Sequence, residues 1–303
     1  MDHKLSPSTV LLLLIPPLLW AGNAVVGRLV IEMIPPITLN FLRWAIAAVF
    51  VLPLGYSVFR KGSGLWRLRR RYAMLGLLGI GLYNGMQYLA LHSSTPINVT
   101  LVGASMPIWM LLIGMLFFRS RIAGRQLLGA LLSLTGVLVV LGRGEWQQLM
   151  QLRFVAGDIF MIVATIIWAF YSWMLVQSTD TPEIRRNWAT FLVAQLSFGM
   201  MWSALFAAGE WALTDARIEW SLPLWAALMY VAIGPAIIAF MCWGIGVQRA
   251  GPATAGFFSN LTPLFAALMS SAFLGEMPHL YHAAAFALIV GGILFSTRRR
   301  DRG

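Results

Sequence analysis

Ten long apolar stretches follow one another along the chain, and short polar segments separate them. A helix needs about 20 mostly apolar residues to cross a bilayer, and each stretch has about that length. The predicted spanning helices are residues 9–29, 36–58, 72–92, 96–118, 122–142, 155–177, 186–208, 222–248, 252–274 and 279–297. The pattern predicts an all-α integral membrane protein with ten transmembrane helices.

Composition leads to the same class of protein. The chain is 59% hydrophobic and 11% charged, with a mean hydropathy of +0.76, whereas about a quarter of an ordinary soluble chain is charged. The single cysteine, Cys242, excludes an intrachain disulfide and a cysteine-based metal site. The first stretch is similar to a signal peptide, but we interpret it as a retained helix because the repeat described below requires it.

Basic residues are distributed unequally between the two ends of the predicted helices. Of the 22 Lys and Arg residues, 17 lie on the side that holds both termini and four on the other, with Arg43 inside a helix. Lysine and arginine mark the cytoplasmic side of a membrane, so we predict that both termini are cytoplasmic. The net charge of +11 lies in these clusters. Since no soluble basic face with interleaved aromatic residues accompanies them, no nucleic acid partner is expected.

The sequence also indicates an internal repeat. Pro96 and Pro107 of the fourth predicted helix recur as Pro252 and Pro263 of the ninth, at one offset of 156 residues. Two five-helix halves enter a membrane with opposite orientation because five is odd, which gives the inverted repeat of many secondary transporters. Chance similarity between two apolar helices is the alternative. The two predicted halves are residues 1–148 (helices one to five) and 149–303 (helices six to ten).

Short motifs in the first two predicted helices suggest a family. They are Leu19-Trp20-Ala21-Gly22-Asn23-Ala24-Val25, Ile34-Pro35-Pro36-Ile37-Thr38-Leu39 and Phe41-Leu42-Arg43-Trp44. Together with the paired prolines, they resemble the drug/metabolite transporter superfamily and, within it, the EamA group. The resemblance implies a duplicated ten-helix fold and a multi-pass exporter of the bacterial inner membrane, with amino acids among its substrates. Aromatic amino acid exporters of this group look similar to the chain.

Arg43 is the one basic residue away from the end of a predicted helix. A central arginine costs roughly 2.5 to 3.5 kcal/mol on membrane-insertion scales, so it needs a partner or water. One interpretation is an anchor for a substrate carboxylate. The other is a structural residue that bonds to neighbouring carbonyls or extends toward the membrane surface, since it lies only about seven residues into its helix.

Polar and aromatic side chains at membrane depth indicate a pathway for a solute. Residues three or four apart share one face of a helix, as Trp20 and Asn23 do, and Trp168 and Tyr171. Each residue alone is also compatible with helix packing or lipid contact, but the set favours a pathway. The candidates for substrate binding are Trp20, Asn23, Arg43, Tyr83, Asn84, Gln87, Tyr88, Trp168, Tyr171, Trp243 and Asn260.

Two prolines are candidates for hinges. Pro107 and Pro263 break intrahelical hydrogen bonds at corresponding positions of the two halves. Close helix packing explains them as well, and gating by helix bending is the functional hypothesis.

The acidic residues bear on the energetics of transport. None of the eleven Asp and Glu residues falls in the middle of a predicted helix. The proton-coupled four-helix relatives that the resemblance brings in use a glutamate in their first helix, which has no acid here. The hypothesis is therefore facilitated, alternating-access export of aromatic amino acids or of other neutral or zwitterionic metabolites.

Other classes of protein remain as alternatives. An enzyme is not expected, because no nucleophile with a base, His-Glu-x-x-His helix or pair of embedded aspartates occurs; no catalytic residue, metal or cofactor is predicted. The expected partners are a small-molecule substrate and the lipid bilayer, and a monomer would suffice. The alternatives are a nucleotide-sugar or drug exporter of the same superfamily and a non-transporting membrane scaffold.

Overall fold

The computed structural model describes residues 5–94, 96–177, 179–274 and 279–297, and every regular element within these ranges is helical. Lys4 and the four arginines of residues 298–302, which enter the charge distribution above, lie outside the described residues. The elements are α1 (Pro7–Leu29), α2 (Pro36–Gly55), η1 (Tyr56–Phe59), α3 (Arg69–Gly76), η2 (Leu77–Leu82), α4 (Tyr83–Ser93), α5 (Pro96–Gly103), α6 (Met106–Phe118), α7 (Gly124–Leu141), α8 (Trp146–Met150), α9 (Ala156–Leu175), α10 (Pro182–Arg185), α11 (Trp188–Leu213), α12 (Leu222–Val231), η3 (Ala232–Ile238), α13 (Ala239–Ala250), α14 (Pro252–Ser259), α15 (Leu261–Leu274) and α16 (Leu280–Thr297).

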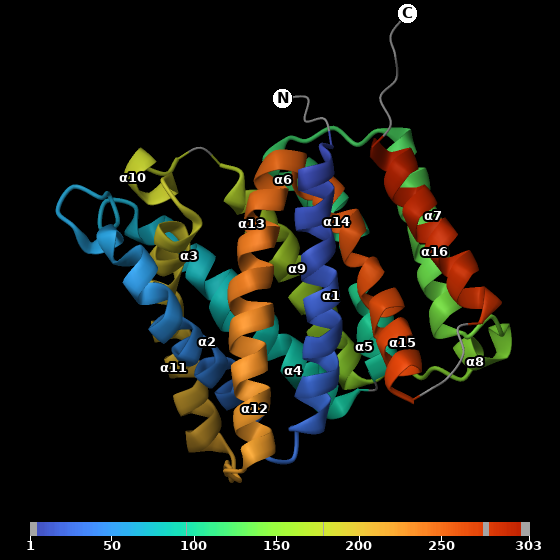
Figure 1. Cartoon of the computed structure of the whole chain (residues 1–303), viewed down its shortest axis with the longest axis horizontal. Coiled ribbons are helices and arrows are strands. Elements are labelled where there is room, and N and C mark those ends of the chain that lie inside the picture. The colour runs from blue at the N-terminus through green and yellow to red at the C-terminus, as the bar shows by residue number, and fades with distance from the viewer. Residues whose placement is uncertain (1–4, 95, 178, 275–278, 298–303) are drawn as a thin grey trace, which may run out of the picture.

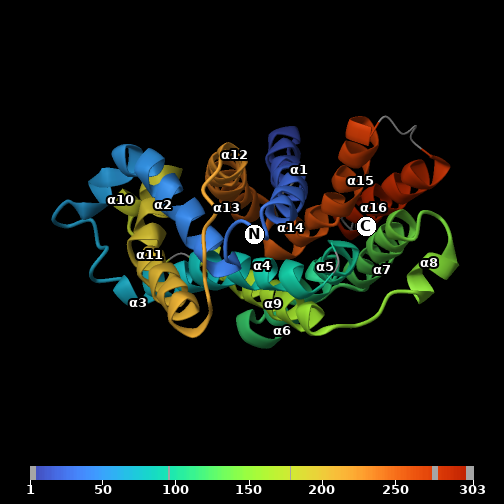
Figure 2. The same cartoon turned by 90° about the horizontal axis from the view of Figure 1, so that it is seen from below.

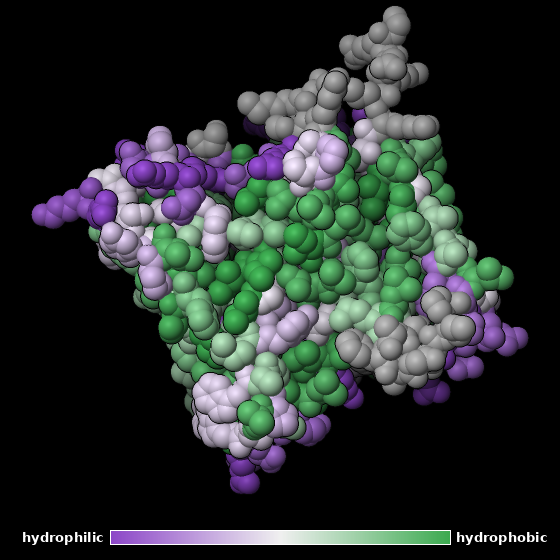
Figure 3. Space-filling view, viewed as in Figure 1, coloured by the Kyte–Doolittle hydropathy of each residue, from purple (hydrophilic) through white to green (hydrophobic). Residues whose placement is uncertain are grey.

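Nine helical segments of the described chain are long and apolar enough to cross a membrane. They are Pro7–Leu29, Pro36–Phe59, Arg69–Ser93, Asn98–Phe118, Gly124–Leu141, Ala156–Leu175, Trp188–Leu213, Leu222–Ala250 and Leu280–Thr297. The stretch predicted as the ninth span instead forms two helices, α14 and α15, with Asn260 between them. A hydrophobic belt crosses the molecule between hydrophilic upper and lower edges (Figure 3). Helices suit such a belt because their backbone groups bond to one another.

The helices run roughly parallel to one axis, and α1 begins on the side where α16 ends (Figure 1). Seen from below, they form two layers, with α12, α13, α1 and α15 on one side and α4, α9 and α6 on the other (Figure 2). The segment α2 packs on α11 at one end of the bundle, and α7 packs on α16 at the other. The centre is therefore built by α1, α4, α9 and α13.

Two spanning segments contain π-helical turns. They are η2, between α3 and α4, and η3, between α12 and α13. A π-turn displaces the backbone hydrogen bonds and often occurs at functional sites. Asn40, a fully buried residue of α2, donates through its side-chain amide to two carbonyl oxygens of η2, those of Ile80 (2.9 Å) and Gly81 (3.2 Å). The side chain from α2 thus stabilises the irregular turn.

Two other segments are interrupted at their middle. Helix α5 ends at Gly103 and α6 begins at Met106, with Pro107 in its first turn. Helix α14 ends at Ser259 and α15 begins at Leu261, so Pro263 is the third residue of the new helix. Both candidate hinge prolines therefore follow directly after an interruption, where a missing N–H costs little.

Glycines hold α7 and α16 together. A Cβ on Gly292 would lie 2.6 Å from the carbonyl oxygen of Gly129, and a Cβ on Gly129 would lie 2.7 Å from that of Gly292. Each backbone thus touches the other where a side chain would stand. Small residues allow such close approach between helices in membranes.

The adjacent pair Gly291 and Gly292 allows a matched test of this contact. A Cβ on Gly291 would meet nothing within 4 Å. We expect Gly292→Val to lower the free energy of unfolding by about 1–3 kcal/mol because it forces the two helices apart. Gly291→Val should leave it nearly unchanged. Thermal unfolding in detergent measures both, and equal melting temperatures for the two variants would contradict the packing described.

A buried carboxylate ties the start of α3 to the segment between α9 and α10. Asp180 accepts from Arg71 through Nε (2.7 Å) and Nη2 (3.0 Å), from the Tyr72 hydroxyl (2.6 Å) and from Arg185 Nε (2.7 Å). Its side chain is 1% exposed. Burial alone would raise the pKa of Asp180, but the hydrogen bonds from Arg71 and Tyr72 and the charge of Arg185 hold it below its usual range.

The lowered pKa of Asp180 makes this cluster sensitive to acid. A depressed pKa contributes stability above about pH 4, the ordinary aspartate range, and the contribution disappears as the pH falls through the folded-state pKa. We expect Asp180→Asn to cost about 3 kcal/mol at neutral pH, since it leaves buried arginine without its counterion. Melting temperatures of the wild-type protein and of Asp180→Asn, measured from pH 3 to 8, should therefore converge at low pH. Asp215→Asn changes an exposed residue and is the control. A loss of stability in Asp215→Asn as large as that in Asp180→Asn would contradict the stabilising role given to the Asp180 cluster.

Candidate functional site

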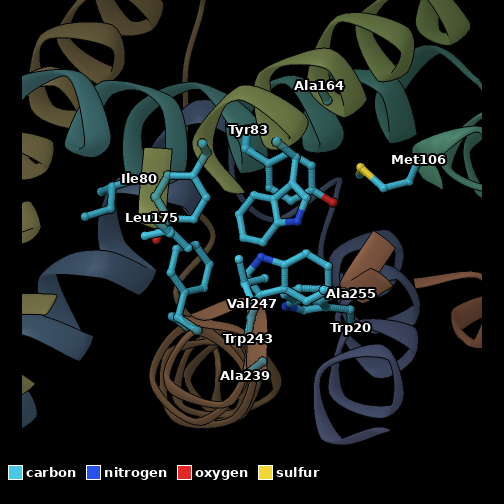
Figure 4. Packing of buried hydrophobic residues seen from close by; sticks show 14 of the residues in the cluster. Trp20, Ile80, Tyr83, Met106, Ala164, Leu175, Ala239, Trp243, Val247 and Ala255 are labelled. Atoms are coloured by element: carbon cyan, nitrogen blue, oxygen red, sulfur yellow. The ribbon is translucent and has the colours of Figure 1, made fainter. Parts of the chain in front are cut away.

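Aromatic rings gather where α1, α9 and α13 meet. The ring centroids of Trp20 and Trp168 lie 5.3 Å apart, those of Trp20 and Trp243 5.3 Å, and those of Trp168 and Trp243 5.6 Å. Trp20 and Trp243 face one another below Tyr83 in Figure 4. Tilted and edge-on ring pairs at such distances contribute about 0.5–1.5 kcal/mol each beyond their buried area. The three predicted tryptophans therefore form one cluster.

Trp168 is the centre of this cluster. Tyr83 of α4 lies 4.4 Å from its ring and Tyr171, one turn further along α9, lies 4.9 Å away. Phe240 of α13 lies 5.2 Å away. The Trp168 ring is fully buried. Elements from both halves of the chain thus close around one indole.

Two cavities adjoin the cluster on different sides. One of about 60 Å³ is lined by Trp20, Tyr83, Gln87 and Trp168 together with residues next to the interruptions of the helices, among them Ala104, Ser259, Thr262 and Pro263. The other, of about 260 Å³, reaches Tyr171 and Phe240 and includes Arg185, Arg186 and Arg249. Pockets for organic ligands measure about 300–1,000 Å³, so the smaller cavity holds only a few water molecules. The two cavities share no lining residue, and rings of the cluster line both of them.

Arg43 is fully buried in a network of neutral side chains and is not among the residues that line these two cavities. Its Nη1 donates to the side-chain oxygens of Asn84 (2.8 Å) and Asn23 (3.3 Å) and to the Tyr88 hydroxyl oxygen (2.9 Å). Tyr88 in turn donates to Asn23 Oδ1 (2.9 Å). The two ion pairs of the described residues both involve Asp180, so no described carboxylate neutralises Arg43.

Gln87 connects this network with the smaller cavity. The Asn23 amide donates to Gln87 Oε1 (3.4 Å), and Gln87 lines the cavity beside Tyr83. The four substrate-binding candidates on α4 thus divide into two rows. Tyr83 and Gln87 face the cavity, whereas Asn84 and Tyr88 face Arg43.

The remaining candidates lie at different places. Trp243 donates through Nε1 to Ser172 Oγ (3.1 Å) and belongs to the ring cluster. Tyr171 donates to Gln195 Oε1 (2.9 Å). Asn260 is fully buried and donates to Ser133 Oγ (2.9 Å) on α7, so its neighbours Ser259 and Thr262 line the smaller cavity instead.

Three residues of the site were missed by sequence reasoning. Asn40 and Trp44 stand three residues before and one residue after Arg43 on α2, so a polar and aromatic grouping around Arg43 could have indicated them. Phe240 resembles any other apolar residue of a spanning helix, and only its ring contacts with Trp44 (4.7 Å) and Trp168 distinguish it. The sequence carries no signal for that contact.

The site offers ring faces, amides, hydroxyls and one guanidinium. The described residues contain no group of three or more His, Cys, Asp or Glu side chains that could hold a metal ion. Neither cavity is lined by a carboxylate. Such a lining suits hydrogen bonding and stacking with an organic solute.

Comparison with known proteins connects this arrangement with transporters. The model of the EamA-like transporter family matches residues 7–142 and again residues 155–298. An uncharacterized transporter of Archaeoglobus fulgidus is 24% identical over 98% of this chain and 100% of its own length. The aromatic amino acid exporter YddG of Ancylobacter novellus is 26% identical over 87% of this chain and 88% of its own.

The fold has a counterpart among solved structures. One crystal structure aligns with a TM-score of 0.71 at 24% sequence identity and covers 95% of this chain and 96% of the other. At that identity the likeness indicates a common fold alone.

Proposed function

The chain belongs to the EamA-like transporter family, and on that premise we propose that it exports aromatic amino acids, or other neutral or zwitterionic metabolites, across the bacterial inner membrane. Members of this family are transporters rather than enzymes. A multi-pass membrane protein agrees with the nine apolar helices of the described chain. The proposal concerns the substrate, the direction and the mechanism of transport.

The ring cluster around Trp168 is the observation that supports an aromatic substrate. Tyr83, Trp20 and Trp168 line the smaller cavity, and Tyr171 and Phe240 line the larger one. A solute that passes between the two cavities must slide past these rings, which favours an aromatic side chain over a strongly hydrated one. A relative at 26% identity is named an aromatic amino acid exporter, which supports the same class.

We propose ten spans in two inverted halves, residues 1–148 and 149–303, with α14 and α15 together as the ninth. The repeated family match supports this division. Two irregularities support it as well. The π-helices η2 and η3 begin 155 residues apart, at Leu77 and Ala232, and the interruptions at Ala104 and Asn260 stand 156 residues apart. Corresponding irregularities at offsets that agree within one residue are expected if the halves descend from one unit.

The interrupted helices are the proposed moving parts. Broken helices near the middle of the membrane surround the binding sites of many secondary transporters. Ala104, Ser259 and Pro263 stand at or next to the interruptions and also line the smaller cavity. A bend at Pro107 or Pro263 would therefore change the shape of that cavity, which is what alternating access between the two sides of the membrane requires.

Transport without ion coupling is supported by the hydrogen-bond partners of three buried or partly buried acids. Asp158 accepts from Ser94 (2.5 Å) at the start of α9, and Asp180 is paired with arginines. Glu210 accepts from the backbone N–H of Thr38 (2.7 Å), where a carboxylate stabilises the N-terminus of α2. All three have structural partners, so none of them is proposed as a proton carrier.

Counterflow in proteoliposomes tests this function. Vesicles loaded with phenylalanine should accumulate labelled external phenylalanine, since a carrier exchanges the two pools. An imposed pH gradient should change the rate little. Absence of counterflow with every aromatic amino acid would contradict the proposed substrate, and strong stimulation by the gradient would contradict uncoupled transport.

A matched pair of variants connects that activity with the ring cluster. Trp168→Leu should lower the exchange of phenylalanine relative to that of leucine by about 3- to 10-fold. The reason is the loss of one or two contacts between the phenyl ring of the solute and the ring cluster. Trp146→Leu changes an exposed tryptophan of α8 and should leave the ratio unchanged. An unchanged ratio in Trp168→Leu would place the aromatic selectivity elsewhere.

The proposed orientation has its own test. In a Cys242→Ala background, Lys61→Cys and Asp215→Cys place one thiol on each side of the proposed membrane. An impermeant maleimide applied to intact cells should label Asp215→Cys at once and Lys61→Cys only after permeabilisation, since the 17 basic residues mark the cytoplasmic side. The reverse order of labelling would contradict the orientation.

A further inference from the structure

Within the described part of the chain, the guanidinium of Arg43 donates hydrogen bonds through one of its three nitrogens. Asn23, Asn84 and Tyr88 all accept from Nη1. Nε and Nη2 are buried and have no hydrogen-bond partner among the described residues. The side chain is 0% exposed, so it does not extend to the membrane surface. The interpretation of Arg43 as a structural residue that extends toward the membrane surface is therefore excluded.

Two side chains in contact with Arg43 also carry buried donors without acceptors. The Asn84 amide nitrogen and the Trp44 indole nitrogen also lack partners within the described chain. The Trp44 ring lies 5.5 Å from the Arg43 guanidinium carbon, and Asn84 bonds to Nη1 directly. The unpartnered atoms of these three side chains are all donors, and one group carries a positive charge. A buried donor without an acceptor costs about 1–3 kcal/mol, so the arrangement suits an anionic acceptor.

Arg71 of the same chain provides a direct comparison. Its Nε and Nη2 donate to the two oxygens of Asp180 at 2.7 and 3.0 Å. This side-on edge, with two parallel N–H bonds, is the geometry in which arginine binds a carboxylate bidentately. Arg43 donates through Nη1 to neutral oxygens. Its Nε and Nη2 edge, the one that binds Asp180 in Arg71, has no acceptor among the described residues.

We propose that the Nε and Nη2 edge of Arg43, with Asn84 and Trp44 beside it, binds the carboxylate of the transported solute. The assignment rests on the proposed function and narrows it, since the substrates must be monocarboxylates with an apolar or aromatic body. Amines and amides of the same shape are excluded. A single guanidinium among neutral groups also disfavours phosphate esters, which need more than one cation.

The position of Arg43 suits a solute in transit. Asn23 and Gln87 connect Arg43 with the smaller cavity. Trp44, whose ring lies 5.5 Å from the Arg43 guanidinium carbon, contacts Phe240, which lines the larger cavity. A carboxylate on Arg43 thus lies near the rings that line the two cavities. The anchor can hold the charged end of the solute while its aromatic end passes Trp168.

A series of phenyl ligands with and without the carboxylate tests the proposal on the wild-type protein. Phenylalanine, 3-phenylpropionate, phenylalanine amide and phenethylamine compete for labelled phenylalanine in counterflow. We expect the two carboxylates to compete and the amide and the amine to be about 10- to 100-fold weaker, the range for losing a hydrogen-bonded charged group. Competition by phenethylamine within about twofold of phenylalanine would overturn the proposal.

Substitutions at Arg43 assign the discrimination to this residue. Arg43→Gln should remove the preference for phenylalanine over phenethylamine, and Arg43→Lys should keep only part of it, because lysine retains the charge without the fork. Arg28→Gln is the matched control, since Arg28 donates to the Leu91 carbonyl oxygen (2.9 Å) on the neighbouring segment. A folded Arg43→Gln that keeps the preference would overturn the proposal. If Arg43→Gln does not fold, Arg43→Lys decides: a preference equal to that of wild type counts against the anchor.

Failure of the proposed function would look different. The wild-type protein would then show no phenylalanine counterflow, and the carboxylate site would be tested by ligand-dependent thermal stability. Stabilisation by 3-phenylpropionate but not by 3-phenylpropionamide would support the anchor. Equal effects of the two compounds would overturn it.

Discussion

A positive charge inside an apolar helix bundle needs oxygen atoms around it, and the centre of this protein is arranged to meet that need for Arg43. Oxygens from α1 and α4 gather on one guanidinium nitrogen. The neighbouring Asn40 stabilises the π-turn of η2, directly before Tyr83 and Asn84. The positions of α1, α2 and α4 are thus coupled through one buried charge, because each supplies a group that the others would leave unpaired.

The ring cluster and the helix interruptions complete this arrangement. Trp168 joins α1, α4, α9 and α13 into one packed centre. The neighbouring segments are irregular, with π-turns in two of them and breaks in two others. Regular helices pack rigidly, whereas interruptions allow a segment to bend about a fixed point. In the proposed mechanism, the aromatic cluster stays in place while the interrupted segments bend and open one cavity at a time.

Much of this fold follows from the sequence, because hydrophobic length, basic clusters and paired prolines are local signals. The approximate ranges of nine spanning helices were accessible in this way. Trp20 and Trp168 were candidates from their sequence positions, but their ring contact is a tertiary feature. The packing role of Asn260 could not be predicted, because its hydrogen-bond partner Ser133 lies on a different helix. Phe240 and the π-turns depend on tertiary packing, for which an apolar stretch of sequence gives no pattern. The unused edge of Arg43 is a matter of atomic geometry that no sequence motif encodes.

The central claim is that a buried arginine recognises the carboxylate of the solute beside an aromatic barrier. A structure of the protein determined with bound phenylalanine measures this directly. The account predicts carboxylate oxygens about 2.7–2.9 Å from Nε and Nη2 of Arg43, with the phenyl ring against the Trp168 cluster. A phenylalanine whose carboxylate binds elsewhere, for example at Arg186 or Arg249 of the larger cavity, with Arg43 unchanged, would contradict it.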